Sequence, residues 1–314
     1  MKYRVRLVGV LTATAALCAP LAPLGAQSRY GECDAGTLSL RDACYKAVDL
    51  FNYLAPQLNT SIAGGNATLG QGGTLGGFPH WSGELRASGM SGSLPQISGL
   101  QLSTAGQVAT DIPVRSQAIG IPTVDAAIGL YRGVALPAMD VLGVDLLLSA
   151  AYVPTLNGAS MGVHPTGAAF RLGYGARIGL MQESAALPGV SLTYMVRDLP
   201  TADVVGTTID RSSGETDTVG VRGLSLTTKA WRLVASKSFT FFGLVAGVGQ
   251  DRYQSSGNLS VYVKDANGCS SGCSGTPFGF SQTLTRMNYF ADVAFNLKVA
   301  KLVGEIGRVS GGSV

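Results

Sequence analysis

The sequence predicts an all-β protein, a transmembrane antiparallel up-and-down β-barrel preceded by a short N-terminal helix. Three observations support this fold class. Apolar residues alternate with small or charged residues in nine separate stretches, and the connections between these stretches are alternately long and short. In addition, no segment beyond the N-terminus contains the ~18 consecutive apolar residues of a membrane-spanning helix, although 46% of the chain is hydrophobic.

Residues 1–26 have the form of an export signal. Three basic residues precede a short apolar run, and Ala26 ends a stretch of small residues that fits a cleavage site. Cys18 follows Leu17, where a lipid-attachment site needs a small residue, so we expect no lipidation. Cleavage removes three basic residues and no acidic one, which lowers the net charge from +4 to +1. This balance gives no reason to expect nucleic acid as a partner.

Residues 27–78 are predicted to form a helical segment followed by a glycine-rich linker. Apolar residues recur at helical spacing over residues 39–55, and Pro56 ends the pattern. The stretch SIAGGNATLGQGGTLGGFP, residues 61–79, lacks the strand that precedes a phosphate-binding loop, so we interpret it as a flexible connector. The helix either plugs the barrel or packs under its periplasmic mouth, and both placements are open at this point.

Four cysteines remain after cleavage of the export signal: Cys33, Cys44, Cys269 and Cys273. An even number in an exported chain indicates disulfides. Local pairing of Cys33 with Cys44 and of Cys269 with Cys273 is the simplest of the three connectivities. The second pair has acceptable spacing for metal ligands, but no further Cys or His pair accompanies it, so we predict neither a metal nor a cofactor.

Residues 79–314 are predicted to form the barrel. The clearest strand is AFRLGYGARIGLM, residues 169–181, where Phe, Leu, Tyr, Ala, Ile and Leu alternate with Arg and Gly. One face suits lipid and the other faces an interior. A parity change within 219–236 indicates a β-bulge. The alternation predicts strands at 81–89, 124–132, 141–152, 168–181, 190–197, 219–236, 242–263, 284–297 and 300–309.

The connections between these strands carry the strongest signal. Long connections span 91–122, 153–166, 199–218 and 264–279, whereas short ones span 133–140, 182–188, 237–241 and 298–299. Short periplasmic turns that alternate with long external loops are typical of outer-membrane barrels. A secreted sandwich with Greek-key connections, the rival fold, lacks this regularity. We therefore expect the protein in the outer membrane, with the lipid bilayer as its partner.

The odd strand number conflicts with this fold, because bacterial single-chain barrels have even numbers and we expect about 10–12 strands. Either a strand escapes detection, inside 91–122 or by a division of 241–263, or the chain is C-terminally truncated and lacks its closing strand. We favour truncation. A barrel that lacks its closing strand has two open edges, which lipid does not tolerate.

Charged residues on the polar phase of the strands are predicted to line the lumen: Glu84, Arg86, Arg171, Arg177, Arg197, Arg286, Asp292 and Glu305, with Lys301 on the same phase. One interpretation is that they pair across the lumen and stiffen it. The other is that the arginine excess favours passage of anions. Aromatic residues are predicted to form the interfacial girdle: Trp81, Tyr152, Phe170, Tyr174, Tyr194, Trp231 and Phe242.

Catalytic motifs are weak. Ser160 lies in a G-x-S-x-G match near His164, but this motif needs a strand before it and a helix after it, and here the match lies in a loop between strands. His80 with Ser82 and Glu84 is the only local acid–base set. We therefore predict that the protein is not an enzyme.

The order of an exported helical segment, a connector Ala63-Gly-Gly-Asn-Ala-Thr-Leu-Gly and a barrel resembles that of the long-chain fatty-acid transporter-like outer-membrane barrels (OmpP1 type). Asn66-Ala-Thr stands where that family has Asn-Pro-Ala. The resemblance implies a hatch-like N-terminus and passage of a hydrophobic small molecule. We expect a passive channel or facilitator for small solutes. The alternatives are a barrel without an open pore that contacts partners at the cell surface, and a barrel hydrolase.

Overall fold

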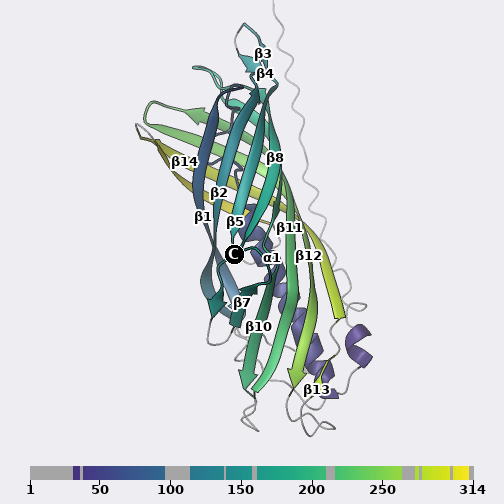
Figure 1. Ribbon diagram of the computed structural model, residues 1–314. Helices are drawn as coiled ribbons and strands as arrows, with labels where there is room; N and C mark the ends of the chain where they lie inside the picture. Colours follow the sequence, from purple (N-terminus) through teal and green to yellow (C-terminus); the bar gives the residue numbers. More distant parts are fainter. Residues whose placement is uncertain are drawn as a thin grey trace, which may run out of the picture.

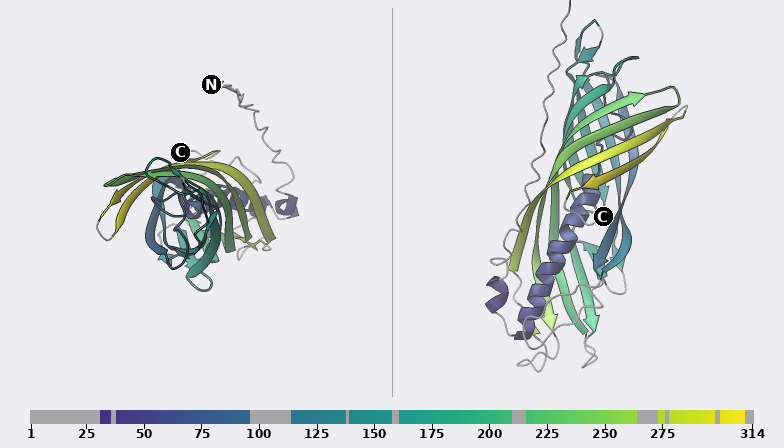
Figure 2. Two further views of the ribbon diagram at one scale, coloured as in Figure 1. Left: turned by 90° about the horizontal axis from the view of Figure 1, so that it is seen from above. Right: turned by 180° about the vertical axis from the view of Figure 1, so that it is seen from behind.

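One large antiparallel sheet curls around a single long helix in the computed structural model of the chain (Figures 1 and 2). The structure describes residues 31–35, 38–95, 114–137, 139–157, 161–209, 216–263, 273–275, 278–297 and 300–310. The predicted export signal, residues 1–26, lies outside these ranges. In the part of the chain that is described, no helix is both long and apolar enough to cross a membrane.

Nine long strands form the sheet, and each corresponds to one of the nine predicted from alternation. They are β1 (Trp81–Pro95), β2 (Val114–Tyr131), β5 (Gly143–Tyr152), β8 (Phe170–Met181), β9 (Gly189–Asp198), β11 (Thr216–Ser238), β12 (Phe242–Val263), β14 (Phe278–Asn296) and β15 (Lys301–Val309). Each pairs antiparallel with the next in this order. Within the described residues β1 and β15 do not pair with each other, so the sheet is a curled half-barrel.

Several predicted connections contain strand. Residues 91–95 belong to β1 and residues 114–122 to β2, and β12 is a single strand, so neither place supplies a tenth long strand within the described residues. The other predicted connections carry short strands: β3 (Val134–Ala135), β4 (Asp140–Val141), β6 (Leu156–Asn157), β7 (Met161–Pro165), β10 (Ala202–Ile209) and β13 (Cys273–Ser274). β10 pairs with β11 beyond β9, after a break that contains Pro200, a residue without a backbone N–H.

The short turns β8–β9, β11–β12 and β14–β15 gather at one end of the sheet, the upper end in Figure 1. The bulge predicted from the parity change in 219–236 is confirmed. The β11–β12 register shifts between Arg222 and Ser225, and Gly223 adopts a φ of 60°. The buried positions accordingly change from Val219 and Val221 to Leu224 and Leu226.

Helix α1 (Leu38–Ala63) is longer than predicted, because it continues through Pro56. Proline removes one helical hydrogen bond at a cost of about 3 kcal/mol, so the prediction that it ends the helix was reasonable. Tertiary contacts hold the following turns instead. The Asn59 side-chain amide donates to Ser255 Oγ (2.8 Å), and Thr228 Oγ1 donates to Asn59 Oδ1 (3.0 Å).

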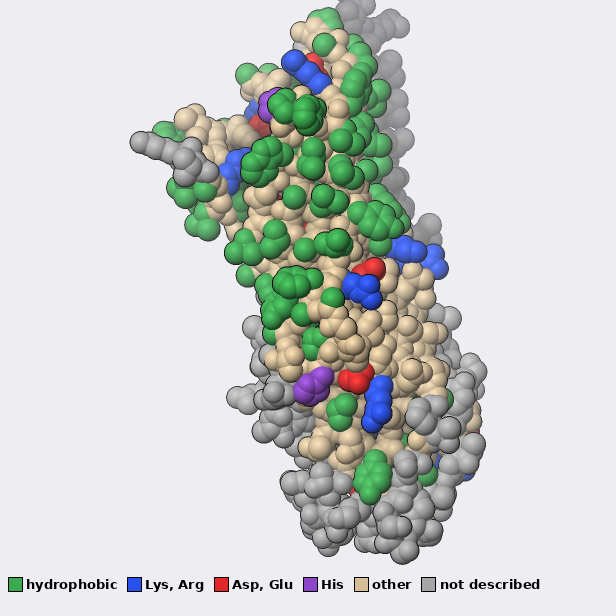
Figure 3. Space-filling model, in the orientation of Figure 1, with side chains coloured by type: hydrophobic (Ala, Val, Ile, Leu, Met, Phe, Trp, Pro, Cys, Tyr) green, Lys and Arg blue, Asp and Glu red, His purple; other side chains and the backbone are tan. Residues whose placement is uncertain are grey.

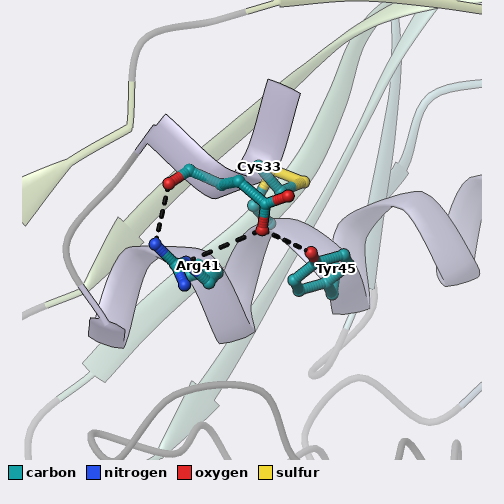
Figure 4. The surroundings of a disulfide bond; sticks show 5 residues. Cys33, Arg41 and Tyr45 are labelled. Carbon is teal, nitrogen blue, oxygen red and sulfur yellow. Dashed lines mark hydrogen bonds and ion pairs between the residues drawn. A yellow bond between two sulfur atoms is a disulfide. The ribbon is translucent and has the colours of Figure 1, made fainter. Parts of the chain in front are cut away.

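The predicted disulfide Cys33–Cys44 is confirmed, and it ties the 3₁₀ turn Gly31–Ala35 to α1 (Figure 4). Beside it Arg41 Nη2 donates to the Asp34 carbonyl (2.8 Å), and Tyr45 Oη donates to Asp34 Oδ1 (2.7 Å). This last hydrogen bond raises the pKa of the Tyr45 phenol. The predicted partner of Cys273, Cys269, lies outside the described residues.

Candidate functional site

The concave side of the sheet carries buried ion pairs. Arg177 and Asp145 lie directly opposite each other on β8 and β5, and Arg177 Nη2 is 2.7 Å from Asp145 Oδ2. Both side chains are almost fully buried, at 1% and 0% exposure. Arg232 Nη1 of β11 likewise lies 2.6 Å from Asp251 Oδ1 of β12. A buried charge is tolerated only when it is paired. These ion pairs therefore allow charged side chains to occupy the inward-facing positions of the strands.

A second group of charges connects β1, β2 and β9. Arg86 Nε is 3.2 Å from Asp125 Oδ2, and Arg197 Nη2 is 3.5 Å from Asp125 Oδ1. Arg86 also contacts Glu84 at 3.0 Å. Asp125 thus lies between two arginines that project from strands on either side of it in the sheet.

Two of these arginines, Arg197 and Arg232, also donate hydrogen bonds to the C-terminal end of helix α1. Arg197 Nη1 donates to the Ala63 carbonyl (2.8 Å), and Arg232 donates to the carbonyls of Gly64 (3.0 Å) and Gly65 (2.9 Å). Gly64 has a φ of 61°, the left-handed conformation that commonly terminates a helix. The last carbonyls of a helix lack helical partners and form the negative end of its dipole, so guanidinium groups are well suited to this position.

Carboxylates of the strands hold the backbone amides of the linker that follows. Glu305 accepts from the amides of Gly65 (3.0 Å) and Asn66 (2.7 Å), and Asp292 accepts from that of Gly70 (3.1 Å). Further amides are held in the same way, that of Leu69 by Glu84 (2.9 Å) and that of Leu75 by Asp145 (3.1 Å). The linker is therefore held against the sheet by hydrogen bonds, and the prediction of a flexible connector was wrong.

Six of the eight predicted lumen residues meet around this linker: Glu84, Arg86, Arg177, Arg197, Asp292 and Glu305. Two do not join it. Arg286 is half-buried opposite Asp251, and Arg171 is exposed. Lys301, on the same phase, is exposed as well.

Sequence analysis missed Asp125, Asp145, Arg232, Asp251 and Asn288 as site residues, although a signal was present. Each occupies the polar phase of its strand; Arg232, for example, lies between the outward Trp231 and Leu233.

The other half of the interior is apolar. One side of α1, including Val48, Leu50 and Phe51, packs on the inner faces of β11 and β12. Phe51 meets Phe280 of β14 edge to face, with ring centroids 5.1 Å apart. Helix α1 thus lies within the curl of the sheet, as Figure 2 shows, which matches the plug placement and contradicts packing under the short-turn end.

The outer face changes character along the strands. Leu233, Val248 and Tyr289 form an apolar row across β11, β12 and β14. Four residues away, the matching row is Lys229, Arg252 and Thr285, all exposed. We call the part from the apolar row to the short turns the short-turn half, and the part beyond the polar row the long-loop half.

Large apolar side chains cover the outside of the short-turn half (Figure 3). Leu172, Ile178, Leu192 and Leu244 are 75%, 41%, 41% and 47% exposed, while Arg177 and Arg197 are buried. A soluble sandwich would show the reverse. All seven aromatic residues predicted for the girdle are exposed: Trp81, Tyr152, Phe170, Tyr174, Tyr194, Trp231 and Phe242.

Among the described residues, the weak catalytic candidates Glu84, His80 and His164 have other partners. Glu84 engages Arg86 and the linker, and His80 Nδ1 contacts the Gly77 carbonyl at 2.9 Å. His164 lies on β7 opposite Asp203, and Ser160 is outside the described residues. In comparisons with protein-family models, curated proteins and solved structures, nothing matches the chain.

Proposed function

We propose that the protein is an outer-membrane barrel whose short-turn half spans the bilayer. The exposed apolar outer face of this half carries the proposal. From Phe170 to Leu180, β8 advances ten residues, roughly 33 Å at ~3.3 Å per residue, which a tilt of ~40° reduces to about 25 Å of height. This is the height of the apolar band around an outer-membrane barrel.

The proposed activity is facilitated passage of small solutes, with residues 38–80 as an internal plug that closes the resting state. The ion pairs and hydrogen bonds at bilayer height all engage this plug or one another, so passage requires the linker to leave its arginine and carboxylate partners. The buried arginines then line the opened path and favour anions.

A second candidate function is a surface-contact barrel that never opens. The apolar packing of α1 against β11 and β12 favours it, because this packing resembles a permanent protein core. In that case the long-loop half, with its polar outer face, is the part that meets partners outside the cell.

Conductance in planar bilayers separates the two candidates. The variant Arg197→Gln, Arg232→Gln, Asp251→Asn removes the arginine donors to the Ala63–Gly65 carbonyls, each worth ~1.5–3 kcal/mol, and leaves no buried carboxylate without a partner. Asn288 Nδ2 still donates to the Gly64 carbonyl (2.9 Å) in this variant. We expect no conductance steps from the wild type and clear steps from this variant.

Arg171→Gln is the matched control, because Arg171 shares the inward phase but is exposed and is not one of the arginines that hold the Ala63–Gly65 carbonyls. The pore of this variant should stay closed. Heat-dependent migration on gels verifies that each protein is folded. A folded triple variant that conducts no better than the wild type would reject the channel and favour the closed barrel.

A further inference from the structure

The sheet has two edges that are not hydrogen bonded to each other. Among the described residues, β1 pairs only with β2 and β15 pairs only with β14. If the proposed function holds, β15 and the first residues of β1, whose Trp81 and Leu85 are outward and exposed, meet the bilayer with unpaired N–H and C=O groups. Lipid offers no hydrogen-bond partners to such groups. We call the gap between β1 and β15 the seam.

The number of strands determines what fits the seam. Nine strands with antiparallel neighbours place β1 and β15 in the same direction. They therefore cannot form an antiparallel ladder with each other. One additional strand would run antiparallel to both and would continue the pattern of every other long pair in the sheet.

The contacts across the seam indicate a gap one strand wide. Where strands pair, opposite side chains meet directly, as Asp145 and Arg177 do. Across the seam, Arg86 of β1 and Glu305 of β15 meet only through Asn66: Arg86 Nη2 donates to its carbonyl (2.6 Å) and its amide donates to Glu305 (2.7 Å). Two strands that flank a third lie roughly 10 Å apart, twice the usual strand spacing.

A second copy of the chain does not fit this requirement. Antiparallel pairing of β15 with β15, or of β1 with β1, needs a two-fold axis perpendicular to the strands, which turns one copy upside down in the membrane. Two copies in the same orientation bring β15 of one beside β1 of its partner, and these strands are parallel. This step rests on the membrane orientation proposed above.

We propose that the seam accepts one extended peptide strand, antiparallel to β1 and β15, with apolar residues outward and small residues inward. The outward neighbours set the first requirement, since Trp81, Leu85, Leu302 and Ile306 are 75%, 79%, 66% and 78% exposed. The crowded interior sets the second. A Cβ added at Gly65 would lie 2.7 Å from the Glu305 carboxylate, so the space behind the seam is already filled.

Hydrogen exchange of the wild-type chain in detergent micelles tests the proposal without any substitution. The probe is a synthetic ten-residue peptide that alternates Leu or Val with Ser or Gly. Its control has Pro at two of the small positions, which removes N–H donors. We expect the probe, and not its control, to slow exchange of seam-facing amides in β1 and β15 about tenfold or more, with central β12 unchanged.

Cross-linking locates the peptide independently. In a background with Cys269→Ser and Cys273→Ser, Gly83→Cys on β1 and Gly304→Cys on β15 provide outward probes, and the space beside Gly304 is open. Ala246→Cys, outward on central β12, is the matched control. A peptide that carries one cysteine should cross-link to both edge positions and not to the control.

Two results would overturn the proposal: seam amides that are already protected without peptide, or a peptide that neither protects nor cross-links to either edge. Neither result depends on conductance. A failure here therefore leaves the channel proposal untouched, and a closed pore leaves the seam untouched.

Discussion

At the scale of single residues, arginine is the group that joins plug and sheet. Its planar fork donates several hydrogen bonds at once, so Arg232 pairs with Asp251 and still holds the carbonyls of Gly64 and Gly65. Alternation predicted that Arg86, Arg177 and Arg197 face inward. It did not predict that Arg86 and Arg197 donate to linker carbonyls, because a sequence does not show which backbone carbonyls lie near a side chain.

Glycine at position 70 is required for the linker to pack against β14. Gly70 has a φ of 68°, and an added Cβ would lie 2.8 Å from the Ala294 Cβ. We predict that Gly70→Ala destabilises the protein by about 2–4 kcal/mol, from left-handed strain plus overpacking. Urea unfolding followed by tryptophan fluorescence measures this.

Gly76→Ala is the control for backbone strain alone. Gly76 has a φ of 87°, but no atom lies within 4 Å of the added Cβ. It should therefore lose only about 1–2 kcal/mol. Equal losses in the two variants would show that the linker does not pack against β14 as described.

At the scale of elements, periodicity located every long strand in the part of the chain that the structure describes, but it misjudged the ends of β1 and β2. Alternation is strong where one face meets an apolar solvent and the other a polar interior. It is weak in the flank of β1, where Ser91, Gly92 and Ser93 occupy both phases, and in the flank of β2, where Arg115 and Gln117 share a phase with Ile119 and Ile121, so residues 91–95 and 114–122 were assigned to a loop. The end of α1 was misjudged for another reason, since the contacts that outweigh Pro56 come from residues nearly 200 positions away.

The disulfide should act on the first turns of α1 alone, because the arginines hold its other end. A cross-link across 11 residues stabilises by about 3 kcal/mol. We predict that dithiothreitol speeds hydrogen exchange in residues 38–45 and leaves residues 59–66 unchanged.

The Cys33→Ser, Cys44→Ser variant provides the control, since dithiothreitol should have no effect on it. Faster exchange at both ends of the reduced helix would mean that Arg197 and Arg232 do not fix the C-terminal end of α1 by themselves.

At the scale of the whole molecule, the two halves present opposite faces to their surroundings. The short-turn half is apolar outside and charged inside, whereas the long-loop half is polar outside and packs α1 in an apolar core. The sequence predicted the apolar outside and charged inside of the first half, because side chains that face lipid alternate along each strand with side chains that face the interior. It did not predict the second, because the helix and the strands that share this core are far apart in the chain.

The most direct test of the outward apolar face uses the two native tryptophans, Trp81 and Trp231, which are the only ones in the chain. Both are outward and exposed, at 75% and 39%. In proteoliposomes, we predict strong quenching of their fluorescence by brominated lipids and little quenching by aqueous iodide. Strong quenching by iodide with none by brominated lipids would contradict the proposal that this face meets the bilayer.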